Sequence, residues 1–382
     1  MYLENSDLPE KGFIMNARLK TIFGCLAVIA LVFGFLHLVI PESGYNFERL
    51  HVFLFNLCGG GSLLLFFTLK TRTIPKRVSV FLVCSITYAF FAFFKLYIPA
   101  MVLSLILAVI VESVRVEKFS FLPWGFFRRD EPVFLKFHQA ALLCLSMALV
   151  ISTLVILNNE YLKLIYMKKL QLDTFFLGFS FPLSLITFSL IFSFIEESER
   201  PLVIFTKEAG FWLVNLGVVI FFLFIIFEQL HPQVVVTTIL FITVMAIFYL
   251  FYQLGKNLQQ KHFLVSGMGF LVVTAITGIA YILFEYSYDY SPGQYKWLLN
   301  LHAFAALYGW NLCGLSVICR YNDFPVRLHS FPIIALHWIT VLLFAPLGKF
   351  QPLFAVLALA GYIVILFFLL FSKRQLAPIN PT

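Results

Sequence analysis

The sequence predicts an all-α polytopic membrane protein, a helical bundle of about twelve transmembrane helices. Of its 382 residues, 61% are hydrophobic and 12% are charged, and the mean hydropathy is +0.94. A soluble globular protein of this length needs more polar surface than such a composition provides. The apolar residues form long continuous runs rather than the alternating pattern of a membrane β-barrel strand. Because a helix satisfies its own backbone hydrogen bonds in lipid, helices are the expected spanning elements.

The apolar runs divide the chain into twelve predicted spans. A helix of about 20 residues crosses a hydrocarbon core of about 30 Å, and each run is close to that length. The loops are short, so residues 19–372 are predicted to form a single transmembrane domain between tails at 1–18 and 373–382. The sequence leaves open whether the third and fourth spans are one broken element. In chain order, the predicted spans are Thr21–Ile40, Leu50–Leu69, Val78–Phe94, Ile98–Val114, Phe134–Leu157, Thr174–Ile195, Ala209–Phe227, Val234–Tyr252, Phe263–Phe284, Trp297–Cys319, Phe331–Leu347 and Pro352–Phe371.

The basic residues predict the orientation of the bundle, since lysine and arginine are held back in cytoplasmic loops during insertion. With twelve spans and a cytoplasmic N-terminus, 20 of the 27 basic residues fall on the inner side and seven on the outer side. Both tails are therefore expected in the cytoplasm, and the expected location is a bacterial inner membrane. The seven outer residues are Arg49, Lys95, Lys163, Lys168, Lys169, Lys296 and Lys349.

Charge and cysteine content argue against several other classes of protein. The net charge of +8 comes from basic residues scattered beside helix ends, so topology explains it and no nucleic-acid partner is expected. The six cysteines lie in apolar runs or at their ends with no CxxC spacing, which indicates neither a disulfide framework nor a zinc site. The chain also lacks a Walker lysine loop, an HExxH motif and a GxSxG elbow. The lipid bilayer is thus the partner that composition predicts.

Two histidines are candidate cofactor ligands, because ionisable side chains inside a span are costly and are often functional. The predicted second and tenth spans run from the outer to the inner side, which places His51 and His302 at a similar depth, about 5 to 8 Å below the outer interface. Small residues follow each histidine along its helix face and leave a flat volume that suits a haem with two axial imidazoles. Alternatively, the small residues allow close helix packing and each histidine bonds a neighbour. The small residues are Cys58, Gly59, Gly60, Gly61 and Ser62 in one span and Ala305, Ala306, Gly309 and Cys313 in the other.

Two short segments resemble the main subunit of haem–copper oxidases and nitric oxide reductases. Phe47–His51, followed by Phe55 and Gly59–Gly61, resembles the second helix of that family. Asn300–Phe304, continuing to Tyr308–Trp310, resembles its tenth helix. The family has twelve spans with both termini inside, as predicted for this chain.

The resemblance implies a low-spin haem near the outer face, with His51 and His302 as its axial ligands. Arg49 lies just outside His51 and is a candidate partner for a haem propionate, which requires a cation. Gly309 lies on the face that makes room for the ring. The implied role is electron transfer, or sensing linked to haem or nitric oxide, with a redox protein or a quinol as the partner.

The sequence departs from the family at the binuclear centre. Asn300 occupies the position of the high-spin haem ligand, the sixth span has no histidine, and the seventh offers only Trp212 and Asn215. A complete oxidase or nitric oxide reductase is therefore not expected. A bacterial membrane family linked to nitric oxide response, which also binds haem, is loosely similar through its H-A…G…G…R run. The matching residues are His302, Ala303, Gly309, Gly314 and Arg320.

Two other functions stay open. Asn56, Asn215 and Asn311 lie near mid-membrane and suit a secondary transporter of a small or amphipathic solute. A structural subunit of a larger membrane complex is the third hypothesis. The arrangement of side chains discriminates between the first two: haem requires the His51 and His302 rings to face each other with Nε2 atoms about 4 Å apart. A cavity around the polar residues favours the transporter.

Overall fold

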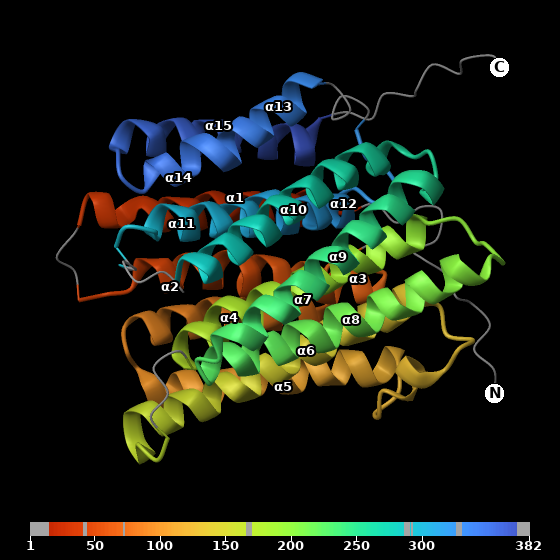
Figure 1. Ribbon diagram of the computed structural model, residues 1–382. Helices are drawn as coiled ribbons and strands as arrows, with labels where there is room; N and C mark the ends of the chain where they lie inside the picture. The colour runs from red at the N-terminus through yellow and green to blue at the C-terminus, as the bar shows by residue number, and fades with distance from the viewer. Residues whose placement is uncertain are drawn as a thin grey trace.

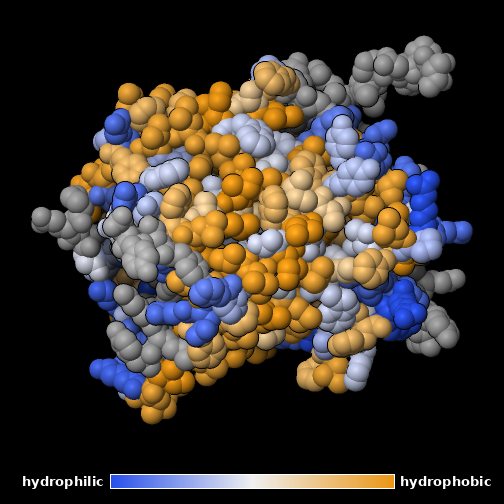
Figure 2. Space-filling view, viewed as in Figure 1, coloured by the Kyte–Doolittle hydropathy of each residue, from blue (hydrophilic) through white to orange (hydrophobic). Residues whose placement is uncertain are grey.

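The computed structural model describes residues 15–40, 44–71, 73–165, 170–285, 291, 293–325 and 331–372, with the side chains of residues 170–177 excepted. This part of the chain is a bundle of long helices lying side by side, and it contains no β-strand (Figure 1). Figure 2 shows a predominantly apolar surface with hydrophilic residues concentrated towards the two ends of the bundle. The predicted all-α fold class is confirmed.

Eleven helical segments among the described residues are long and apolar enough to cross a membrane, so the chain is a multi-pass membrane protein. Helix α7 occupies the remaining predicted span, and the twelve predicted runs each coincide with a helical segment. The unbroken helices are α1 (Ala17–Phe35), α4 (Lys76–Phe93), α5 (Tyr97–Lys118), α6 (Val133–Ile156), α7 (Leu170–Phe194), α8 (Pro201–Ile226), α9 (Leu230–Leu254), α10 (Gln259–Glu285) and α15 (Pro352–Phe371).

Three spans are interrupted by π-helical turns, which are frequent at functional sites because the extra residue changes which side chains face inward. The second span is built from α2 (Phe47–Val52), η2 (Phe53–Gly61) and α3 (Ser62–Leu69). The tenth is built from α11 (Lys296–Phe304), η5 (Ala305–Asn311) and α12 (Leu312–Cys319). The eleventh is built from α13 (Phe331–Ile339), η7 (Thr340–Phe344) and α14 (Ala345–Gly348).

The third and fourth spans are two separate helices rather than one broken element. Helix α4 ends at Phe93 and α5 begins at Tyr97, and the two helices pack against each other. The reversal between them occurs at Lys95, whose φ of 61° lies in the left-handed region. That conformation cannot continue a right-handed helix, so the chain turns back.

The second and tenth spans form the centre of the bundle. Of an apolar stretch of 18 residues in the second span, 94% are buried inside the bundle. The corresponding share in α8 is 17%. Segments η2 and η5 both pack against α7, and η5 also contacts η7. At Gly314 the contact between α12 and α7 is so close that a Cβ would collide with the Thr187 side chain. Such small residues allow helices to approach closely in lipid.

Candidate functional site

His51 packs between its own span, α1 and η5. Its Nδ1–H donates to the Ala30 carbonyl at 2.7 Å, and its ring stacks on Tyr308 with centroids 5.4 Å apart and planes inclined by 22°. A Cβ at Gly34 would come within 2.9 Å of Nδ1, so this glycine makes room for the ring. The side chain is only 2% exposed. His51 is therefore enclosed by packing on several sides.

His302 packs in a different place, against α10. Its Nδ1–H donates to the Thr274 carbonyl at 2.9 Å, and the Thr277 hydroxyl oxygen is 3.4 Å from the same nitrogen. Gly278 accommodates the ring edge, because a Cβ there would lie 3.1 Å from Cε1. The ring thus lies between α11 and α10.

The structure does not bring the two imidazoles together. The His51 ring faces Phe304 and Tyr308, which are four residues apart on one face of the tenth span, whereas His302 points from that span towards α10. The volume expected beside Gly309 is taken by the Phe270 ring. As placed, these residues do not fit a haem held between the two imidazoles.

Arg49 also lies away from the expected haem position. The ionisable side chains within electrostatic range of it include Tyr88, Tyr97 and Glu160, which belong to α4, α5 and the end of the fifth span. Its backbone N–H is bound by the Asn46 side chain at 2.9 Å, which caps α2. Among the described residues, no group of three His, Cys, Asp or Glu side chains is placed to hold a metal ion.

The structure instead gathers polar side chains at the middle of the bundle. This asparagine–serine cluster consists of Asn56 on η2, Ser180 and Ser184 on α7, and Trp310 and Asn311 on η5. The Asn56 amide donates to the Ser180 hydroxyl at 2.7 Å, and the Ser184 hydroxyl donates to Asn311 Oδ1 at 3.0 Å. Trp310 Nε1 donates to Ser184 at 3.0 Å. Asn56 Oδ1 is buried and has no hydrogen-bond partner.

The third candidate asparagine, Asn215, does not join this cluster. Its amide donates to the Phe211 carbonyl of its own helix at 2.8 Å. The sequence had pointed to Asn56 and Asn311 but not to the two serines. Their signal is the spacing of Ser180 and Ser184, because residues four apart lie on one face of a helix.

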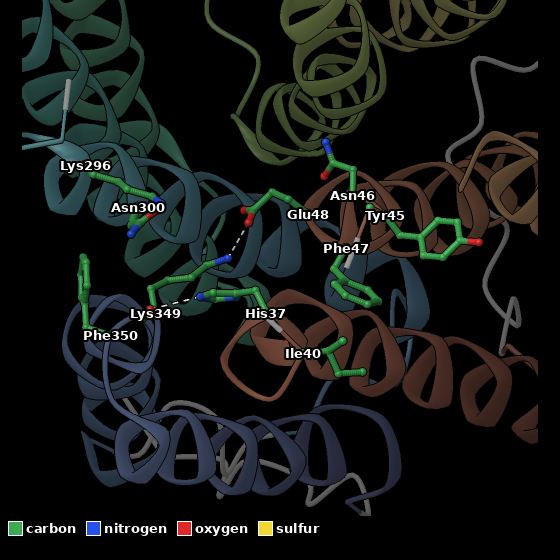
Figure 3. A pocket seen from close by; sticks show the side chains of 11 residues that line it. His37, Ile40, Tyr45, Asn46, Phe47, Glu48, Lys296, Asn300, Lys349 and Phe350 are labelled. Carbon is green, nitrogen blue, oxygen red and sulfur yellow. Dashed lines mark hydrogen bonds and ion pairs between the residues drawn. The ribbon is translucent and has the colours of Figure 1, made fainter. Parts of the chain in front are cut away.

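A pocket of about 560 Å3 lies at the end of the bundle where α2 and α11 begin, called here the Lys349 end. The Lys349 ammonium lies 2.6 Å from the Glu48 carboxylate and donates to the Gly34 carbonyl at 2.8 Å. His37 donates from Nε2 to the Lys349 carbonyl at 3.1 Å (Figure 3). The pocket is lined by His37, Ile40, Gly44, Tyr45, Asn46, Phe47, Glu48, Lys296, Asn300, Lys349 and Phe350.

A layer of rings separates this pocket from the asparagine–serine cluster. Gly34 contacts both the pocket and the ring layer. Its carbonyl accepts a hydrogen bond from Lys349, and the His51 ring occupies the space where a Cβ would lie. Beneath it, Tyr308 stacks on His51 and lies 4.8 Å from the Tyr362 ring, measured between centroids. Tyr308 is followed directly by the η5 residues that join the cluster. The order along the bundle is therefore pocket, ring layer and polar cluster.

The chain was compared with protein-family models, with curated proteins and with solved structures, and none of the three comparisons found a match.

Proposed function

We propose that this protein is a secondary carrier of a small or amphipathic solute. The observation that carries the proposal is the unpartnered Asn56 Oδ1 within a buried polar cluster built on two π-helical segments. A buried polar group without a partner costs about 1–3 kcal/mol, and the cost is offset when a ligand supplies the hydrogen bond. Carriers bind their solutes near mid-membrane on interrupted helices. Helix association alone accounts for the bonded members of the cluster but not for this oxygen.

In this proposal the solute enters from the pocket and passes the ring layer to reach the cluster. The excess of basic residues in alternate loops supports a cytoplasmic location for the opposite end, called here the Arg320 end. The Lys349 end then faces outward in a bacterial inner membrane. In this proposal the ring layer is the barrier between the two compartments.

Replacing Asn56 with leucine is expected to reduce solute uptake about tenfold, the effect of losing one hydrogen bond to the solute. Uptake of radiolabelled alanine, phenylacetate and glucose is measured in liposomes that contain the purified protein. Asn215→Leu is the matched control, because its amide bonds only its own helix, and its uptake should equal that of the native chain. Uptake no greater than in protein-free liposomes argues against the carrier. Equal uptake above that level by the native and Asn56→Leu proteins argues against Asn56 as the solute-binding residue.

Haem binding for electron transfer or sensing is the second candidate, and one observation favours it. His51 and His302 both donate Nδ1–H to a main-chain carbonyl, which leaves Nε2 with the lone pair, as in metal-ligating histidines. A redox protein or a quinol would then be the partner. Against this candidate, the two rings lie on different sides of α11 and do not fit one shared haem.

A reduced-minus-oxidised visible spectrum distinguishes the two candidates. The carrier proposal expects protein purified from haem-sufficient cells to show no low-spin haem band. The same spectrum is recorded for a His51→Ala/His302→Ala double variant. A sharp band in the native protein that is lost in the double variant would establish the haem hypothesis and displace the carrier as the leading function.

A further inference from the structure

We propose that the pocket at the Lys349 end binds the carboxylate of an organic acid that has an apolar body. The inference deepens the proposed function, because it names the class of solute that the carrier would take. Binding to the pocket is nevertheless measurable without transport. The argument rests on the charge of the pocket, on its unpartnered donors and on its apolar wall.

The charges of the pocket favour a single negative charge. Lys349 is paired with Glu48, and the two charges cancel. Lys296 also lines the pocket, and among the described residues no acidic side chain forms an ion pair with it. Among the described residues that line the pocket, one positive charge is therefore left over. A ligand with two negative charges would meet the Glu48 carboxylate, so a monoanion is the better match.

The donors of the pocket suit the two oxygens of a carboxylate. Asn300 lines the pocket, and its Nδ2 is buried with no hydrogen-bond partner. Lys296 stands four residues earlier on α11, so the two side chains share a face of the helix. Figure 3 shows them beside one another, on the opposite side of the Glu48–Lys349 ion pair from Ile40. Lys296 thus offers an ammonium and Asn300 an amide N–H from neighbouring turns of one helix face. Both can donate to a ligand carboxylate, and hydrogen bonds to an ionised group are stronger than those between neutral groups.

Apolar and aromatic side chains form another part of the pocket wall. Ile40, Tyr45, Phe47 and Phe350 line it, and the volume of about 560 Å3 lies within the range typical of small-molecule sites. A sugar or an inorganic anion would leave this wall without a matching surface. An acid with an aromatic or aliphatic body satisfies both parts of the pocket. It can come from water, as phenylacetate does, or from the membrane, as a fatty acid does.

Calorimetric titration of the purified protein in nanodiscs tests the proposal, with phenylacetate and decanoate as the probes. Both acids are expected to bind, whereas 2-phenylethanol, which has the aromatic body without the charge, should not bind. Tighter binding of phenylacetate indicates a soluble acid, and tighter binding of decanoate indicates a membrane fatty acid. Equal binding of 2-phenylethanol and phenylacetate, or binding of neither acid, overturns the proposal.

Two variants locate the binding to this pocket. Lys296→Gln and Asn300→Leu are each expected to weaken acid binding at least about tenfold. Lys95→Gln is the matched control, because Lys95 is an exposed lysine in the turn between α4 and α5 and does not line the pocket. Melting temperatures equal to that of the native protein show that the variants are folded. Unchanged affinity in both folded pocket variants overturns the assignment.

The titration tests the pocket assignment and the liposome assay tests the carrier, so either proposal can fail without the other. Acid binding without uptake leaves the pocket assignment intact and counts against the carrier. Uptake of glucose or alanine by a protein that binds neither acid supports the carrier and overturns the pocket assignment.

Discussion

Replacing Arg320 with methionine is expected to destabilise the folded bundle by about 3–5 kcal/mol, the usual effect of breaking a buried ion pair. The guanidinium is buried, and its Nε lies 2.8 Å from the Asp323 carboxylate. It also donates to the carbonyls of Leu369, Leu370 and Ser372 at 2.9 to 3.3 Å. Those carbonyls belong to the end of α15, where helical partners are lacking. Methionine would leave the end of α15 without these donors and the Asp323 carboxylate with Lys20, 3.2 Å away, as its remaining cation.

The measurement is the free energy of unfolding in a detergent titration with sodium dodecyl sulfate. Arg320→Lys keeps the charge but not the planar fork, so it should recover only a part of the loss. Arg77→Met is the control, because its ion pair with Glu117 is about half exposed, and such pairs contribute about 0–1 kcal/mol. If Arg320→Met and Arg77→Met unfold at the same detergent fraction, Arg320 does not hold α15 to α12.

The spans could be predicted from sequence because one local quantity determines them. Hydrocarbon thickness sets the length of an apolar run, and twelve runs of that length became twelve helical segments. The ends were less predictable, since a helix continues beyond its apolar part. Helix α8 begins at Pro201 rather than at Ala209, so the polar residues Thr206–Glu208 lie inside the helix, where the Glu208 carboxylate is 2.8 Å from the Lys136 ammonium. Hydropathy does not detect such a turn.

The direction in which each side chain points could not be predicted in the same way. Topology gave His51 and His302 a similar depth, but depth does not determine which neighbouring helix a ring meets. The expected faces also assumed a uniform rotation of 100° per residue, and η2 and η5 break that rotation at the small residues that follow each histidine. The haem volume expected at Gly309 depended on the same assumption, and Phe270 of α10 fills it.

The pocket required tertiary information as well. Its residues come from three regions that are far apart in the sequence, namely the connection from α1 into α2, the start of α11 and the residues that follow α14. Lys349 stood out only as a cation at a helix end, and Asn300 only as a residue that replaces a family histidine. Neither position predicted the other, because their proximity depends on how four helices pack together.

The ion pair at this pocket is expected to be asymmetric, with Glu48→Gln more destabilising than Lys349→Met. The Lys349 side chain is 6% exposed, whereas that of Glu48 is 42% exposed. Removing the carboxylate leaves an ammonium buried beside the Gly34 carbonyl, and an uncompensated buried charge costs about 3–5 kcal/mol. Removing the ammonium leaves a carboxylate that water can reach, and the expected loss is about 1 kcal/mol.

A double-mutant cycle measures this asymmetry and links it to the pocket. The Glu48→Gln/Lys349→Met protein should be more stable than Glu48→Gln alone, because the buried charge is removed with its partner. Asp130→Asn is the control, since its pair with Arg128 is largely exposed, and its unfolding should match that of the native chain. Equal losses in the two single variants would show that water reaches Lys349 as readily as Glu48. The contact of Lys349 with the Gly34 carbonyl would then not shield the ammonium from water, although Gly34 also packs against the His51 ring.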